Sequence, residues 1–306
     1  MLIGLLASII VMDIVRISGT GKHFAKGSRC TVEGEFVMNF REKYGEWAFV
    51  AGSSEGMGGA FCDRLAKNGM NIVVTGRHAD KVEVKCRQLE SDFGIETKGL
   101  VLDLGDNDVL DRVREATDEL EVGFLVYNAG LASMALFTDR DIDFELYRLN
   151  VNVRSQLALA LWFSKGMKER HKGGIILMSS VGGIVGSPFI QTYSATKAYN
   201  FTLAEALWGE LSDLGIDVMA VLPGNTIGQN FTEVPPGTPG FQTGAEVVEE
   251  AFTHFGKEPA FIAGEHNRNL LGGMFDVEKR KQYIMTMKEQ LEATMAQFGT
   301  GTDGKG

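Results

Sequence analysis

The chain has 306 residues, of which 44% are apolar and 23% charged, a composition typical of a globular protein. Its formal net charge of −10, with no basic run to offset it, argues against nucleic acid as a partner. Three cysteines without a C-x-x-C pair and five scattered histidines argue against a disulfide framework or a metal site, and they favour a reducing compartment such as the cytoplasm.

Residues 1–46 precede the first predicted strand and form an apolar segment followed by a polar tether. Residues 1–12 are almost wholly apolar, but a spanning helix needs about 20 apolar residues, and the flanks of a secretory signal are missing. Residues 1–17 could contact a membrane surface or dock a second subunit. The alternatives are a poorly packed extension or upstream sequence read from an early start codon. Residues 18–36 are Gly-rich and polar, as a tether would be.

From Trp47 onward, short β-branched runs alternate with helical patterns, which predicts an α/β fold: a doubly wound parallel sheet (Rossmann-type) with helices on both faces. We expect a single domain over residues 47–265. Its strands should be buried on both faces. The predicted strands are Trp47–Ala51, Asn71–Thr75, Gly99–Leu102, Gly123–Tyr127, Gly174–Met178, Asp217–Val221 and Ala260–Ala263. The predicted helices are Lys81–Phe93, Val109–Leu120, Asp141–Lys168 and Gln191–Leu214.

Two regions lie outside this alternation. Residues 225–245 hold three of the six prolines and lack periodicity, so they predict a substrate lid or a disordered connection, and we favour the lid. Residues 266–306 form a C-terminal segment in which an apolar stripe over Asp276–Phe298 predicts a helix. That helix would pack on its own core or on a partner subunit, and residues 299–306 would be a flexible tail.

A glycine-rich turn follows the first strand. The run Gly52-Ser-Ser-Glu-Gly56-Met-Gly58 leads into apolar residues at helical spacing. Glycines at such a junction allow a tight turn and bring the backbone close to a pyrophosphate, which the first amides of the helix then hold. The turn alone is weak evidence, but its place at the start of a βαβ series favours a dinucleotide site.

Tyr193 and Lys197 lie four residues apart in a predicted helix and therefore share one face. A cation ~4 Å from the phenol, at an effective dielectric of ~20, is worth roughly 4 kcal/mol. The spacing therefore predicts that Lys197 lowers the pKa of Tyr193 toward the pH at which proton transfer is most effective. The alternative is an ordinary Tyr/Lys pair on a solvated helix.

These motifs occur together in the order and spacing of the short-chain dehydrogenase/reductase family, which the chain resembles from about Trp47 to Glu265. Within that family, Lys43–Ala48, Lys67–Val73 and Tyr193–Lys197 are most similar to the branch of 17β-hydroxysteroid dehydrogenases and long-chain 3-oxoacyl-CoA reductases. The resemblance rests on the glycine turn, Asn128-Ala-Gly130, Asn152, Ser180, Tyr193-x3-Lys197 and Pro223-Gly224.

The resemblance implies catalytic and cofactor-binding roles. Tyr193 would be the general acid or base, Lys197 would hold the nicotinamide ribose, and Ser180 would stabilise the substrate oxygen, with Ser179 as its competitor. The implied cofactor-binding residues are Gly52, Ser54, Gly56, Met57, Gly58, Arg77, Asp103, Asn128, Ala129, Gly130, Tyr193, Lys197, Pro223, Gly224 and Thr226.

Other positions keep alternatives. Asn152 would hold a water that connects Lys197 to solvent, but Asn150 could take that role, and Asn152 could simply bond to the helix backbone. Asp103 resembles the family position that contacts adenine, and its alternative is a helix cap. In addition, Ala51 stands where the family usually has threonine and Tyr127 where it has asparagine, which puts the local hydrogen bonding in doubt.

Cofactor choice depends on the end of the second strand. An acidic residue there would bind the ribose hydroxyls of NAD, but the chain has Arg77, which can pair with a 2′-phosphate. NADP(H) is therefore favoured and NAD(H) is the alternative. Glu55 in the glycine turn opposes this choice, because a carboxylate near that phosphate is unfavourable.

The predicted pocket walls are apolar and carry no lysine or arginine for a compact anion. They are Leu131, Ala132–Leu136, Val181–Pro188 and 225–245. The favoured function is an NADP(H)-dependent interconversion of a ketone and a secondary alcohol on a hydrophobic substrate, steroid-like or 3-oxoacyl. The alternatives are an NAD-dependent alcohol or hydroxysteroid dehydrogenase working oxidatively and a non-catalytic nucleotide-binding scaffold. We expect a cytoplasmic homo-oligomer, dimer or tetramer, with membrane association as the alternative.

Overall fold

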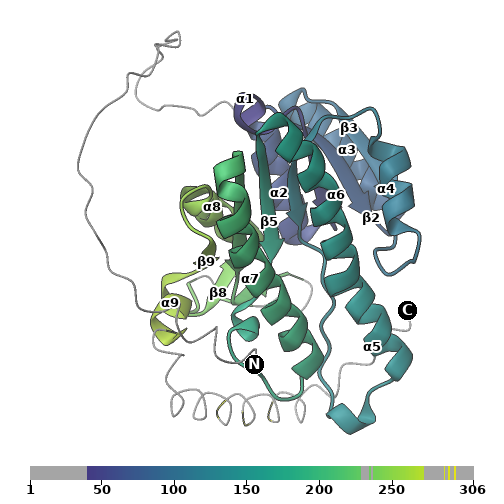
Figure 1. Cartoon of the computed structure of the whole chain (residues 1–306). Helices are drawn as coiled ribbons and strands as arrows, with labels where there is room; N and C mark the ends of the chain where they lie inside the picture. The colour runs from purple at the N-terminus through teal and green to yellow at the C-terminus, as the bar shows by residue number, and fades with distance from the viewer. Residues whose placement is uncertain are drawn as a thin grey trace, which may run out of the picture. The chain divides into compact units, whose positions relative to one another are not determined.

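The predicted parallel sheet is present, and its strands follow the apolar runs of the sequence closely (Figure 1). The computed structural model describes residues 40–228, 234–235 and 237–271, together with positions 286, 289 and 293. All seven strands pair in parallel in the order β3-β2-β1-β4-β5-β6-β9. They are β1 (Trp47–Ala51), β2 (Asn71–Gly76), β3 (Thr97–Val101), β4 (Val122–Tyr127), β5 (Gly173–Met178), β6 (Ile216–Leu222) and β9 (Ala260–Ile262).

Helices cover both faces of the sheet, and each face has its own apolar core. Alternate residues along a strand point to opposite faces, so Phe49 and Val50 in β1 belong to different cores. One core packs against α1 (Phe40–Tyr44), α2 (Gly56–Lys67), α3 (Ala79–Phe93) and α8 (Gly244–His254). The other packs against α4 (Val109–Thr117), α6 (Ser155–Arg170) and α7 (Gln191–Leu211). Both predicted layers of helices are therefore confirmed.

Strand β3 departs from the predicted burial on both faces. It lies at the edge of the sheet, and three of its five residues, among them Val101 at 42%, are exposed. An edge strand has only one neighbouring strand, so its outer side faces solvent. The apolar composition of the run was therefore sufficient to predict a strand but did not reveal its position in the sheet.

The helix predicted over Asp141–Lys168 is broken into three pieces. Asp141 caps α5 (Ile142–Leu149), and a π-helical turn η2 (Asn150–Arg154) then joins α5 to α6. A π turn carries one extra residue per turn, and such turns are frequent at functional sites. Apolar periodicity did not reveal it, because the helical pattern continues on both sides of the inserted residue.

The two departures from the family pattern are compensated by other hydrogen bonds. Thr75 in β2 ties the strand ends together: its hydroxyl donates to the carbonyl of Val50 at 2.9 Å, and it accepts from the N–H of Gly52 at 2.9 Å. Tyr127 donates its hydroxyl to the carbonyl of Val151 at 2.6 Å and so joins β4 to η2. The local hydrogen bonding that these two substitutions put in doubt is therefore present.

The predicted lid contains secondary structure where it is described. Strand β7 (Asn225–Ile227) pairs in parallel with β8 (Phe241–Thr243), and Thr243 begins α8 with a capping box. Positions 229–233 and 236 of the lid lie outside the described residues.

Other predictions fall on segments that are not described. The N-terminal segment 1–39, most of the predicted helix Asp276–Phe298 and the tail 299–306 lie outside the described residues. After α9 (Glu265–Leu271), only the single helical positions 286, 289 and 293 are assigned. Among the described helices, none combines the length and apolarity needed to cross a membrane.

Candidate active site

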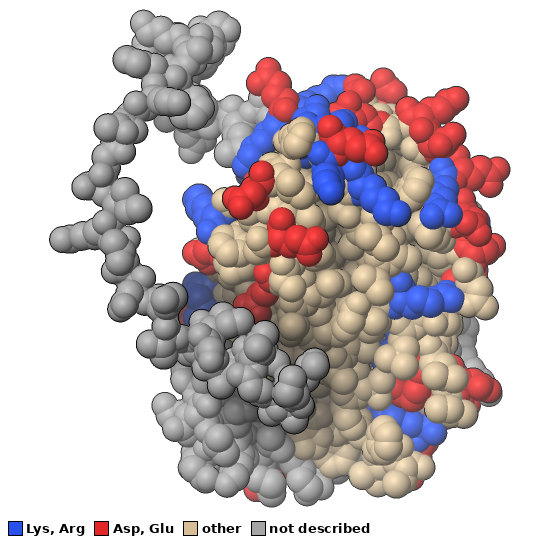
Figure 2. All heavy atoms as spheres, in the orientation of Figure 1, with Lys and Arg blue, Asp and Glu red and all other residues tan. Residues whose placement is uncertain are grey.

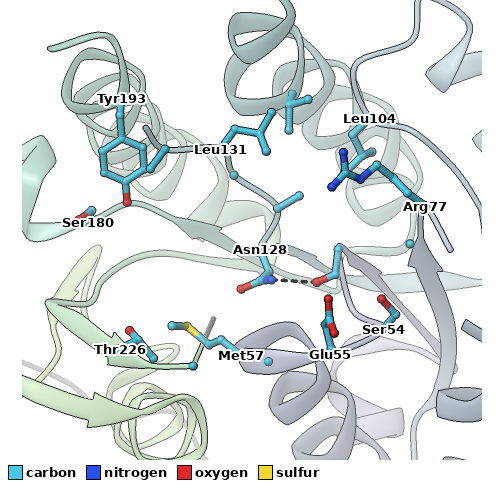
Figure 3. Close-up of a pocket in the computed structure, with 18 of the residues that line it drawn as sticks. Ser54, Glu55, Met57, Arg77, Leu104, Asn128, Leu131, Ser180, Tyr193 and Thr226 are labelled. Atoms are coloured by element: carbon cyan, nitrogen blue, oxygen red, sulfur yellow. Dashed lines mark hydrogen bonds between the residues drawn. The ribbon is translucent and has the colours of Figure 1, made fainter. Parts of the chain in front are cut away.

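A cleft of about 900 Å³ lies at the carboxyl ends of the strands, where the fold predicts a ligand. Figure 3 shows Tyr193 and Ser180 toward one end, Arg77 and Leu104 toward the other, and Asn128 between them. The predicted site residues that line it are Gly52, Ser54, Gly56, Met57, Arg77, Asp103, Asn128, Ala129, Gly130, Ser180, Tyr193, Gly224 and Thr226.

The glycine turn between β1 and α2 is built to bring the backbone to the cleft surface. Gly52 and Gly56 adopt left-handed conformations, with φ of +73° and +60°. A Cβ on Gly58 would lie 2.0 Å from the carbonyl oxygen of Gly52, so only glycine fits there. Asn128 donates to that same carbonyl at 2.8 Å, and no side chain caps the first amides of α2. These exposed amides fit a pyrophosphate.

The charges at the far end of the cleft differ from the expectation in one respect. Arg77 is exposed at the end of β2, as predicted. The carboxylate of Glu55, expected to oppose a phosphate, forms an ion pair with Lys81 at 2.9 Å. Lys81 on α3 also lines the cleft. Its positive charge offsets that of Glu55, so Arg77 is not opposed by an uncompensated carboxylate.

Tyr147 on α5 is a cleft residue that the sequence analysis missed. Its hydroxyl donates to the carboxylate of Asp103, 2.8 and 2.9 Å from the two oxygens. Gly105 donates its N–H to the same carboxylate at 2.8 Å, and the Tyr147 ring packs so closely that a Cβ on Gly105 would lie 2.0 Å from it. Burial and then this bond raise the pKa of the Tyr147 phenol. No local pattern links residues so far apart in sequence.

Tyr193 and Ser180 lie together at the near end of the cleft (Figure 3). Tyr193 stands in the first turn of α7, and Ser180 follows β5. A hydrogen bond with Ser180 lowers the pKa of the Tyr193 phenol, but burial, the larger effect, raises it above its usual value. The competitor Ser179 is buried and donates its hydroxyl to the carbonyl of Lys197 at 2.7 Å. Ser180 is thus the serine that faces the cleft.

That Lys197 lowers the pKa of Tyr193 stays a prediction. Its Nζ donates to the carbonyl of Met178 at 2.7 Å and lies 5.7 Å from the centre of the Tyr193 ring. Burial, with no ion pair among the described residues to compensate it, lowers the pKa of Lys197 to about 8. The carbonyl of Met178 engages one of the three N–H donors of this ammonium.

Asn152 is fully buried and bonded on both sides of its amide. Its Oδ1 accepts from the N–H of Leu131 at 2.8 Å, and its Nδ2 donates to the carbonyl of Leu131 and to the hydroxyl of Thr196, each at 3.0 Å. It therefore joins η2 to the loop after β4 and to α7. The competitor Asn150 points elsewhere, with its Nδ2 donating to the carbonyl of Gly105 at 3.2 Å.

Four predicted site residues are not part of the cleft wall: Gly58, Asn152, Lys197 and Pro223. Pro223 is buried, and its carbonyl accepts from the N–H of Val181 at 3.0 Å. The predicted substrate walls are confirmed only in part. Leu136 is 50% exposed, and Ile184, Val185 and Pro188 line a separate hollow of about 400 Å³. The residues that do form these walls are Leu131, Ala132, Met134, Val181, Gly182, Ser187, Ile190 and Asn225–Gly228.

Comparison with known proteins agrees with this geometry. Residues 46–237 match the family model of the short chain dehydrogenases. The chain belongs to the short-chain dehydrogenase family. The 7beta-hydroxysteroid dehydrogenase of Mediterraneibacter gnavus is 35% identical over 238 residues, which are 76% of this chain and 90% of that protein. The very-long-chain 3-oxoacyl-CoA reductase of Mus musculus is 34% identical over 185 residues, 59% of each chain.

A solved structure from a study of 7beta-hydroxysteroid dehydrogenase stereoselectivity superposes with a TM-score of 0.77 at 33% identity. It covers 82% of this chain and 100% of its own. The predicted family and branch are therefore confirmed. The protein is an NAD(P)-dependent oxidoreductase that interconverts a ketone and a secondary alcohol on a hydrophobic substrate.

Proposed function

We propose that the protein reduces the ketone of a steroid-sized substrate with NADPH and that Tyr193 donates the proton. The observation that carries this proposal is the pairing of Tyr193 and Ser180 in a cleft with apolar walls. Burial keeps the pKa of the Tyr193 phenol above its usual value, so the phenol holds its proton at neutral pH. A protonated phenol can donate to a developing alkoxide, because an alkoxide is a far stronger base than a phenolate.

The preference for NADPH rests on the charges at the far end of the cleft. Arg77 can pair with a 2′-phosphate through two N–H groups, and the ion pair of Lys81 with Glu55 at 2.9 Å compensates the carboxylate that would oppose that phosphate. No acidic residue stands at the end of β2 to select ribose hydroxyls, since Gly76 precedes Arg77 and His78 follows it. NAD-dependent oxidation stays the alternative.

Each residue of the near end then has a distinct task. Ser180 donates a hydrogen bond to the substrate oxygen, which stabilises the charge that develops there, and Tyr193 supplies the proton. Asn152 bonds both to the loop at Leu131 and to Thr196 on α7, and so it joins the two. Lys197 donates to the carbonyl of Met178 at the end of β5. When bound, the reduced nicotinamide supplies the hydride, and the glycine turn and Asn128 would hold the dinucleotide.

The apolar walls support a steroid-like substrate over a 3-oxoacyl thioester. Leu131, Met134, Val181, Ile190 and Ile227 surround the near end, and no lysine or arginine lines that end among the described residues. The 7beta-hydroxysteroid dehydrogenase relative is also matched over 90% of its length, against 59% for the 3-oxoacyl-CoA reductase. The segment 225–245 follows the carboxyl end of β6, and we propose that it is a substrate lid.

Membrane contact through residues 1–17, a cytoplasmic location and a homo-oligomer stay predictions. Figure 2 shows a broad area with few charges on the face over α6 and α7. The exposed apolar side chains of this region and of α5 are the ones to mutate in a test of self-association: Ile142, Leu146, Leu149, Leu157, Leu161 and Trp208.

The proposal is tested by cofactor binding and by turnover. NADPH and NADH are titrated by protein fluorescence against wild type, Arg77→Glu and the control Arg87→Glu, whose arginine pairs with Glu83 on exposed α3. Arg77→Glu should raise the Kd for NADPH by about tenfold or more, and the control should not. Tighter binding of NADH by wild type would contradict the preference. A panel of steroid ketones, 3-oxoacyl thioesters and aromatic ketones, followed by nicotinamide absorbance, then tests the substrate class; a scaffold would oxidise NADPH with none of them.

A further inference from the structure

The guanidinium of Arg140 joins chain segments that line the substrate end of the cleft, the end near Tyr193 and Ser180. Arg140 lies in the turn between η1 (Phe137–Asp139) and α5, and its side chain is only 2% exposed. It donates to the Oε1 of Glu145 at 2.7 Å, to the hydroxyl and the carbonyl of Ser133 at 3.2 and 3.0 Å, to the carbonyl of Phe189 at 2.5 Å and to the Oε1 of Gln191 at 3.1 Å. One side chain thus joins the loop after β4, α5 and the start of α7.

These partners alternate with the residues that line the cleft. Ser133 stands between Ala132 and Met134, and both of those line the cleft. Phe189 and Gln191 flank Ile190, which also lines the cleft and precedes Tyr193 by three residues. Arg140 therefore bonds to residues next to the lining residues in two wall segments, 132–134 and 189–191, and it ties these two walls to each other.

The backbone of Phe189 is held in a conformation that it would rarely adopt alone. Its φ is +64°, a left-handed value uncommon for a residue other than glycine. Its carbonyl accepts two hydrogen bonds, from Arg140 and from the N–H of Ala135 at 3.0 Å. Strained backbone of this kind persists when the surroundings determine it, and it is frequent at functional sites. The arginine is one of the two donors that hold it.

Only arginine can make this set of contacts. Its planar fork reaches several acceptors in different directions, whereas a lysine ammonium is a single point charge on a flexible stem. The carboxylate of Glu145 lies 2.7 Å from Arg140 and 3.0 Å from Arg148, so one negative charge serves two buried guanidiniums. Oxygens of Ser133, Phe189 and Gln191 accept the remaining hydrogen bonds of Arg140.

We propose that Arg140 is a positioning residue that sets the spacing of the two substrate walls and thereby the size of ketone that the enzyme accepts. The substrate part of this inference rests on the proposed function. A large rigid ketone would contact both walls at once, whereas a small ketone needs only Tyr193 and Ser180. Loss of the Arg140 hydrogen bonds, which we call the clasp, should therefore weaken binding of the large ketone more than binding of the small one.

The test compares Arg140→Lys with the control Arg170→Lys. Arg170 also donates to a backbone carbonyl, that of Val122 at 2.9 Å, but it lies at the amino end of the strands, away from the cleft. Both are assayed with NADPH on a steroid ketone and on cyclohexanone. Arg140→Lys should raise KM for the steroid by about tenfold to a hundredfold, with little change in its kcat or in kcat/KM for cyclohexanone, and Arg170→Lys should keep the wild-type ratio. An equal loss for both ketones in Arg140→Lys would overturn the inference.

A second readout does not need turnover. Amide exchange of Ala135, whose N–H donates to the carbonyl of Phe189, should accelerate at least about tenfold in Arg140→Lys and stay protected in Arg170→Lys, because loss of the Arg140 hydrogen bonds exposes it. The Kd for NADPH should be unchanged in both. Unchanged exchange at Ala135 would overturn the clasp even in an active enzyme. If the wild-type protein reduces neither ketone, the proposed function fails. The exchange measurement then shows by itself whether Arg140 holds the two wall segments together. Gln191→Ala, a milder change, replaces Arg140→Lys if that variant does not fold.

Discussion

Replacement of Lys197 by methionine should stabilise the protein at neutral pH, although it removes a residue of the active site. Lys197 is 4% exposed, and its ammonium donates to the carbonyl of Met178 at 2.7 Å and forms no ion pair with any described residue. Burial therefore lowers its pKa to about 8. In the unfolded chain, the pKa of a lysine is about 10.4. Folding thus favours the neutral amine, and the charged form costs stability.

The magnitude and its pH dependence follow from the two pKa values. A difference of about 2.4 pH units corresponds to about 3 kcal/mol. Below pH 8 both states hold the proton, so the full cost is present in wild type. Between about pH 8 and 10.4, the unfolded state binds more protons than the folded state, and wild-type stability rises with pH relative to the variant. The cost is absent above that range. Loss of the bond to Met178, to which Asn200 also donates at 3.3 Å, subtracts about 1 kcal/mol at every pH.

Urea unfolding of wild type and Lys197→Met at pH 7.0, 8.5 and 10.0 measures this difference directly. The variant should be more stable by about 2 kcal/mol at pH 7.0 and lose most of that advantage by pH 10.0. Lys85→Met is the matched control, because Lys85 is also buried but pairs with Asp63 at 2.6 Å, so its loss should destabilise the protein. A difference between wild type and Lys197→Met that stays constant from pH 7 to 10 would refute the reasoning.

Three further predictions concern the turn and the strand ends. Gly58→Ala should raise the Kd for NADPH by about tenfold to a hundredfold in fluorescence titration, because its Cβ would lie 2.0 Å from a backbone oxygen and must displace the glycine turn. Tyr127→Phe should lower the free energy of unfolding by about 1–2 kcal/mol in urea, because the buried carbonyl of Val151 loses its 2.6 Å partner; no loss would mean that the bond is dispensable. Tyr147→Phe should weaken NADPH binding about fivefold by freeing the carboxylate of Asp103, and calorimetry that finds equal affinity would exclude this role.

The sheet and the glycine turn could be predicted from the sequence because their signals are local. Short β-branched runs define β1 to β6, and Gly52, Gly56 and Gly58 are required by backbone geometry that depends only on their neighbours in the chain. The face of α7 that carries Tyr193 follows from helical spacing alone. These features need no knowledge of tertiary contacts.

The contacts that the sequence could not reveal are those between distant segments. Helical spacing placed Lys197 on the same face as Tyr193, but it could not show that the carbonyl of Met178 would take the ammonium. Tyr147 reaches Asp103 across 44 positions of sequence, and Arg140 reaches Phe189 across 49. No periodic pattern reports such pairs, because they arise only after the sheet has formed.

Turnover by Tyr193→Phe compared with cofactor binding by the same variant tests the central claim most directly. The phenol is the proton donor in this account, so kcat for reduction of a steroid ketone should fall by about 10²-fold to 10⁴-fold. The Kd for NADPH should stay within about twofold of wild type, since the ring and its packing remain. A variant that binds NADPH normally and still reduces the ketone at the wild-type rate would contradict the account.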